Sequence, residues 1–166
     1  KDWCRRFILD LAAKVPEVTI VSGLAYGIDV IAHKAAMESG ISTIIIPAHG
    51  LDRIYPSVHR SVAIQALDKG GILTEYTRET EPERFNFVAR NRIVAGMADA
   101  VVVVESKKKG GSLITADMAV DYGRDVFAVP GRVDDICSAG CNDLIKRNKA
   151  QLIDYADDLI AAMQWQ

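Results

Sequence analysis

The stretch that decides the fold is VTIVSGLAYGIDVIAHKAAM, residues 18–37. A short β-branched run at 18–21 leads into a loop that contains Gly23 and Gly27, and a helical pattern follows at 29–39. A buried strand, a glycine-containing turn and an amphipathic helix in this order predict the first half of a β–α–β unit. The glycines permit a tight turn, and the helix start directs unpaired N–H groups at the loop, where an anion is favoured.

This loop has two interpretations. In the first it holds a phosphate, with Ser22 adding a hydroxyl group. In the second the glycines serve only the turn, and Asp29 only caps the N–H groups of the first helical turn. An isolated pair of glycines does not distinguish the two.

Outward from this stretch, the rest of the chain repeats the same alternation. Further continuous β-branched runs lie at 42–46, 71–74, 100–104 and 126–129, and helical patterns lie at 1–14, 58–67, 84–97 and 112–122. Continuous rather than alternating apolar runs are typical of strands buried on both faces of a parallel sheet. We therefore predict one domain, residues 1–166, of the α/β class: an extended Rossmann-like, mostly parallel sheet with helices on both faces. The final part reads as a short helix, an extended AQLI and a closing helix.

The amino-acid composition says more about the cellular environment of the protein than about its function. The 166 residues carry a net charge of −2, so attraction to a polyanion must come from local charge placement. Three cysteines do not form a disulfide framework, and no signal peptide or bilayer-spanning apolar run is visible. We expect a cytoplasmic protein that makes no contact with a membrane.

Basic and small residues gather where the predicted strands end, and ten of the twenty lysines and arginines fall there. A second glycine-containing helix start has Gly110, Gly111 and Ser112, with Thr115 one turn later. We expect Gly111 to tolerate no bulky side chain. The lysines that end at Lys109 either attract phosphate or form an ordinary solvated charge run.

The most distinctive segment, FNFVARNR, brackets Asn91 with Arg90 and Arg92 at the start of a helix. Helix positions two apart point in different directions, so we expect one arginine to face a ligand and the other to pair with an internal carboxylate, for which Glu75 and Asp29 are candidates. Phe85 and Phe87 are candidates for stacking on bases or for core packing, and Tyr55 has the same ambiguity.

Several signatures are absent from the sequence. It has no GxxxxGK[ST] loop, no complete GxGxxG fingerprint and no histidines at metal-binding spacing. Cys137 and Cys141 lack a second pair of ligands, and no nucleophile stands beside a base. We predict no cofactor, no metal and no catalytic residue.

Five blocks, in order and spacing, resemble the DNA-processing protein A (DprA/Smf) family. They are SGLAYGIDVIAHKAAM, GLDRIYP, FNFVARNRIVAGMADAVVVVES, GGSLITADMAVDYGRDVFAVPG and GCNDLI. The resemblance implies a homodimeric, non-enzymatic protein that binds incoming single-stranded DNA in natural transformation, protects it and loads the RecA recombinase. It implies DNA contacts at Ser22, Gly23, Leu24, Ala25, Gly27, Arg53, Tyr55, Ser57, Arg90, Asn91, Arg92, Lys109, Gly110, Gly111, Ser112 and Thr115.

The chain also departs from the family pattern. The family places a Gly-x-Arg segment, whose arginine contacts DNA, on a strand before the first helix, and we expect the sheet here to lack that strand. Where relatives often have a lysine after YP, this chain has Ser57, with His59 and Arg60 nearby.

Two alternative functions are a Rossmann-like enzyme that hydrolyses nucleoside monophosphates and a module that senses one nucleotide. The enzyme is disfavoured, because SKKKGGSLITA lacks the glutamate of its PGGxGTxxE signature.

Overall fold

The computed structural model describes residues 1–165. The chain divides into two compact units, Lys1–Arg90 (unit 1) and Asn91–Gln166 (unit 2). Each unit contains a parallel three-stranded sheet and its own buried apolar cluster.

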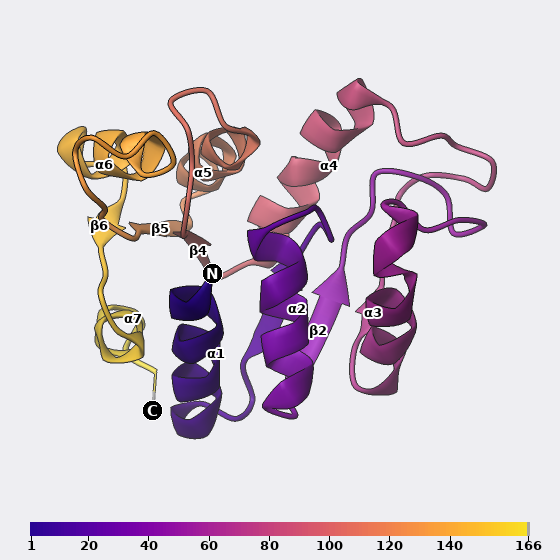
Figure 1. The fold of residues 1–166 in the computed structure, drawn as a ribbon, viewed down its shortest axis with the longest axis horizontal. Coiled ribbons are helices and arrows are strands. Elements are labelled where there is room, and N and C mark those ends of the chain that lie inside the picture. Colours follow the sequence, from indigo (N-terminus) through magenta and orange to yellow (C-terminus); the bar gives the residue numbers. More distant parts are fainter. Residues whose placement is uncertain (166) are drawn as a thin grey trace. The chain divides into compact units, whose positions relative to one another are not determined.

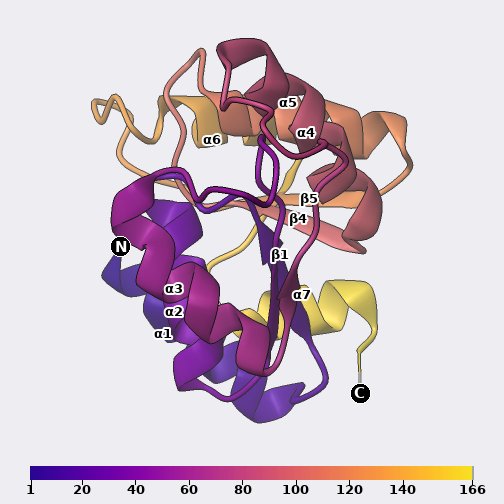
Figure 2. The same cartoon turned by 90° about the vertical axis from the view of Figure 1, so that its right-hand side faces the viewer.

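Unit 1 is built around a sheet of order β1-β2-β3. Its elements are α1 (Asp2–Lys14), β1 (Thr19–Ser22), α2 (Ile28–Glu38), β2 (Ser42–Ile45), the short 3-10 turn η1 (Ser57–His59), α3 (Arg60–Gln65), η2 (Ala66–Asp68) and β3 (Gly71–Ile72). The pairing aligns Ser22 with Ile45, and Ile45 with Ile72. Helix α2 packs across β1 and β2, and α1 lies beside α2 in both views (Figures 1 and 2). The β1–α2 connection therefore lies where β1 ends, as the β–α–β pattern predicts.

Unit 2 has the sheet order β4-β5-β6. Helix α4 (Arg84–Met97) begins in unit 1 and ends in unit 2. It is followed by β4 (Ala100–Val103), α5 (Gly111–Asp121), β5 (Asp125–Ala128), α6 (Ala139–Lys146), β6 (Gln151–Leu152) and α7 (Ala156–Met163). Helix α5 packs on β4 and β5, while α6 packs on β5 (Figure 2). Buried Ala116 and Cys141 belong to the same apolar cluster as Val103 and Ala128.

The predicted α/β class with parallel strands is confirmed. The pairing is divided between two three-stranded sheets, and the central strands β2 and β5 are the most deeply buried. Strands β1 and β6 are partly or largely exposed because each is an edge strand of its sheet. The predicted helix at 58–67 is interrupted, as α3 is flanked by the 3-10 turns η1 and η2. Within residues 1–165, no helix combines the length and the apolar character that crossing a membrane requires.

Candidate functional site

The loop between β1 and α2, residues 22–27, is held by a carboxylate from the helix that follows it. Asp29 Oδ2 accepts hydrogen bonds from the backbone N–H groups of Gly23 (3.2 Å) and Ala25 (3.1 Å). Between them, Leu24 has a φ of 67° and is only 1% exposed. The bonds on either side hold Leu24 in a left-handed conformation that costs a residue with a Cβ free energy. Asp29 therefore caps the loop itself, and two loop N–H groups already have an anionic partner.

Arg90 is the inward-facing arginine of the RNR segment. It is 5% exposed, and its Nη1 donates to the carbonyl oxygens of Gly23 (3.1 Å) and Ile46. Burial lowers the pKa of Arg90, and the negative charge of nearby Asp29 opposes that shift. Arg92, two positions on, is exposed. Sequence alone did not say which arginine turns inward, and the structure places Arg90 on the carbonyl groups at the ends of β1 and β2.

The same contact explains why residue 23 is a glycine. A Cβ at this position would collide with the guanidinium group of Arg90, which lies in the space that the missing side chain leaves open. Gly23 therefore serves a close approach between two parts of unit 1 that are 67 residues apart in sequence.

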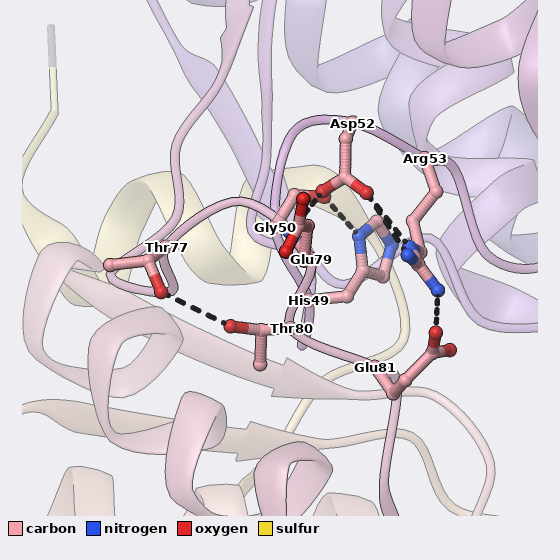
Figure 3. A network of polar contacts seen from close by, with 8 residues as sticks. All are labelled: His49, Gly50, Asp52, Arg53, Thr77, Glu79, Thr80 and Glu81. Carbon is pink, nitrogen blue, oxygen red and sulfur yellow. Dashed lines mark hydrogen bonds and ion pairs between the residues drawn. The ribbon is translucent and has the colours of Figure 1, made fainter.

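The loop after β2 contains a polar network, shown in Figure 3. Buried His49 accepts a hydrogen bond from the Tyr55 N–H group at Nε2 (3.1 Å), so its Nδ1 carries the proton and donates to Gly50 O (2.8 Å). Asp52 accepts from the Glu79 N–H group (2.9 Å) and from Arg53 (3.0 Å), and Arg53 also pairs with Glu81 (Figure 3). Arg53, a predicted phosphate contact, therefore already faces two carboxylates.

The positive charge of Arg53 and the negative charges of Asp52 and Glu81 stabilise one another. Glu81, and then Asp52, raise the pKa of Arg53, while the Glu79 N–H group and Arg53 lower the pKa of Asp52. Because Arg53 is partly exposed, its ion pairs are of the surface type that contributes little net free energy. Replacing Glu81 by a phosphate as the partner of Arg53 would therefore cost little free energy.

Exposed aromatic rings lie in the first loop and in the loop after β2. Tyr26 is 70% exposed and meets the ring of His59 edge-on at 5.0 Å, and His59 in turn lies 2.9 Å from Leu24 O through Nδ1. Tyr55 is 47% exposed, with its ring centre 5.8 Å from that of Phe87. Phe87 thus packs within unit 1. Tyr26 is not among the contacts predicted from the sequence, and its place in the middle of the loop was the only signal for it.

The helix start in unit 2, residues 107–115, has no equivalent of Asp29. Its N-cap is Gly110, with no side-chain cap and no acidic residue in the first turn of α5. Lys109 is exposed, while Ser112 and Thr115 are half-buried. A Cβ at Gly111 would meet no atom within 4 Å, so an alanine fits there, while the exclusion of a bulky side chain stays a prediction.

The structure brings together some of the predicted site residues within each unit. Arg90 meets Gly23 in unit 1, and Asn91 Nδ2 lies 3.5 Å from Gly111 O in unit 2. Exposed Ser57 opens η1, next to Tyr55. A single pocket formed by both units stays a prediction. Among the residues that the structure describes, no group of three or more histidine, cysteine, aspartate or glutamate side chains is placed to hold a metal ion.

Comparison with known proteins relates this chain to a family. The family model for DNA recombination-mediator protein A matches residues 1–164. DNA processing protein DprA of Streptococcus pneumoniae is 42% identical over 149 residues, which are 90% of this chain and 52% of that protein. Protein Smf of Escherichia coli is 40% identical over 164 residues, 98% of this chain and 43% of its own length. The chain thus spans about half the length of the curated relatives it matches.

Solved structures agree with this assignment. The crystal structure of DprA from Streptococcus pneumoniae superposes with a TM-score of 0.87 at 40% identity, covering 96% of this chain and 55% of that one. A structure of DNA processing protein A from Helicobacter pylori, described for its single-stranded DNA binding mode, gives a TM-score of 0.84 at 32% identity over 99% of this chain and 75% of that one. These matches confirm the extended Rossmann-like class, and the chain belongs to the DNA recombination-mediator protein A (DprA/Smf) family.

Proposed function

We propose that this chain binds single-stranded DNA with little sequence preference and catalyses no reaction on it. The observation that carries the proposal is the similarity, at a TM-score of 0.84, to the Helicobacter pylori protein whose structure is described for its single-stranded DNA binding mode. Sequence-tolerant binding needs cations for the phosphates and flat rings for the bases, and the chain offers both on its surface.

The phosphate-binding part of the proposal rests most firmly on unit 2. Lys108 and Lys109 are exposed, and α5 begins without a side-chain cap or an acidic first-turn residue. The partial positive charge of the α5 N-terminus is therefore not compensated by a carboxylate of its own first turn. In unit 1, the exposed rings of Tyr26 and Phe85 are suited to stack on bases.

The residues of the site have different proposed roles. Leu24 contributes only its backbone, because its side chain is buried, and Arg90 acts by holding Gly23 in place. Gly23 and Ala25, whose N–H groups bind Asp29, are proposed to shape the loop. The proposed direct contacts are Ser22, Gly27, Arg53, Tyr55, Ser57, Asn91, Arg92, Lys109, Gly110, Gly111, Ser112 and Thr115.

The direct test is a titration of the protein with fluorescently labelled oligo(dT) and oligo(dA) at low and high salt. We expect binding that weakens steeply with salt and differs little between the two sequences. Arg92→Ala should weaken both complexes equally and reduce the salt slope by about 0.7. Arg6→Ala, an exposed arginine on α1, is the matched control and should change neither. Absence of binding at low salt would refute the function, and an unchanged Arg92→Ala variant would refute the site.

Family membership supports further proposals about partners and setting. We propose that the protein acts as a homodimer in the cytoplasm, protects incoming DNA in natural transformation and loads the RecA recombinase onto it, with units 1 and 2 serving as one domain. Light scattering during size-exclusion chromatography tests the dimer. RecA filament assembly on DNA coated by a single-strand-binding protein tests the loading, and unchanged assembly in the presence of this protein would contradict it.

A further inference from the structure

Unit 2 contains a pocket of about 370 Å³ between the loop that precedes α5, α5 itself and α6. This volume lies at the lower end of the range of cavities that hold small ligands. All of its lining residues belong to unit 2, so the pocket is defined within one compact part of the chain.

The charges that line the pocket leave an excess of two cations. Asp143 pairs with Arg147 Nε at 3.0 Å, and Asp117 pairs with Lys149 Nζ at 2.6 Å. The carboxylates in the lining are thereby neutralised. Lys108 and Lys109 also line the pocket, and neither has an ion-pair partner among residues 1–165. Two unpaired cations beside the start of a helix match the charge of a phosphate dianion.

The remaining wall of the pocket is apolar. It is formed by Leu113 and Ile114 of α5 and by Leu144 of α6. Leu144 is buried, whereas Ile114 remains 37% exposed. An apolar wall beside a cationic rim suits a ligand with a flat, weakly polar part joined to a phosphate, and a nucleotide has this composition.

We propose that this pocket binds a nucleotide phosphomonoester, with the phosphate at Lys108 and Lys109 and the base against Leu113 and Ile114. A terminal phosphomonoester carries nearly two negative charges, whereas a phosphodiester inside a strand carries one. The same group occurs in a free nucleoside monophosphate and at the 5′-phosphorylated end of a DNA strand. Only the second source rests on the proposed function.

Calorimetric titration compares dTMP with thymidine, and a 5′-phosphorylated oligo(dT) with the 5′-hydroxyl strand of equal length. We expect dTMP to bind more tightly than thymidine. Lys108→Ala should weaken dTMP binding about tenfold, the effect of losing one charge-assisted hydrogen bond. Ile114→Ala, at a partly exposed position, should weaken dTMP and thymidine alike. Lys107→Ala removes the same charge from the same loop but outside the pocket, and should leave dTMP binding unchanged.

The outcomes distinguish a free nucleotide from a strand end as the source of the phosphate. They also distinguish a failure of this inference from a failure of the proposed function. A preference of the wild-type protein for the 5′-phosphorylated strand that Lys108→Ala abolishes assigns the pocket to strand ends, and dTMP binding without that preference assigns it to free nucleotides. Absence of dTMP binding, or equal losses in the Lys107→Ala and Lys108→Ala variants with native circular dichroism spectra, overturns the inference. Intact dTMP binding in a protein that binds no single strands refutes the proposed function alone.

Discussion

The glycine-containing segments that lead into α2 and α5 look alike in sequence. They differ in whether a carboxylate accepts hydrogen bonds from their backbone N–H groups. In unit 1, the Asp29 carboxylate accepts hydrogen bonds from the Gly23 and Ala25 N–H groups, and Arg90 fills the space beside Gly23. In unit 2, α5 begins with an open position at Gly111 and no carboxylate in its first turn. A glycine pair therefore predicts the turn. An acidic residue in the following helical turn decides whether the turn is satisfied internally or keeps donors for a ligand.

The largest expected difference between the two sites is steric. Gly23→Ala should lower the free energy of unfolding by about 3 kcal/mol, because the new methyl group displaces a buried guanidinium from its carbonyl partners. Gly111→Ala is the matched control, and should change the free energy of unfolding by less than about 1 kcal/mol, toward greater stability. Urea denaturation measures both values. Equal effects at the two positions would contradict the contrast between the sites.

A second difference concerns pH, because all three histidines belong to unit 1. His33 is buried with Nδ1 2.7 Å from Thr43 Oγ1, and burial lowers its pKa from 6.5 to about 4. Between these values the unfolded chain binds more protons than the folded one, so stability falls as pH drops from 6.5 to 4, by about 3 kcal/mol over the window. Urea unfolding at several pH values should show this slope. In His33→Gln the slope should be much flatter, and a slope equal to that of the wild type would exclude His33 as its source.

The loop carboxylate provides the third test. Asp29→Asn should destabilise the protein by about 2 kcal/mol, because a neutral amide is a weaker acceptor for the two N–H groups beside strained Leu24. Asp117→Asn in unit 2 removes a carboxylate from an exposed ion pair with Lys149 and should cost less than about 1 kcal/mol. If the two variants unfold at the same urea concentration, Asp29 does not hold the loop.

The smallest expected effect concerns DNA affinity. Tyr26→Ala should weaken oligo(dT) binding by about 1 kcal/mol, about fivefold, through loss of one stacking surface. Tyr155→Ala is the control, because Tyr155 is 69% exposed against 70% for Tyr26 but lies in unit 2 at the start of α7. Anisotropy titrations at one salt concentration compare the two variants. Equal affinities would mean that the ring of Tyr26 does not contact the strand.

Most of the secondary structure could be predicted because its signal is local. The bounds of β1, β2, β4 and β5 lie within one residue of the predicted runs, since a continuous β-branched segment marks a strand without reference to distant residues. Strand β3 is shorter than predicted. Only Gly71 and Ile72 pair with β2 as a strand, and Thr74 then turns its hydroxyl group to the carbonyl oxygen of His49.

The site was less predictable because its contacts join residues far apart in sequence. Helix periodicity indicated that Arg90 and Arg92 face different ways, but the inward direction depends on the Gly23 and Ile46 carbonyl groups, which only the folded sheet brings together. Similarly, the pairing of Arg53 with Glu81 depends on where a loop 28 residues later returns. Motif resemblance identified the family, and tertiary contacts determine which side chains of the matched segments are exposed.

The contact between Gly23 and Arg90 also has an evolutionary consequence. A larger side chain at position 23 requires a shorter one at position 90, and a shorter one at position 90 leaves the carbonyl oxygens of Gly23 and buried Ile46 without this donor. Neither position can drift alone without loss of stability, so substitutions at the two sites should occur as a pair. In directed evolution of this chain, a second-site revertant of a position 23 variant is therefore expected at position 90.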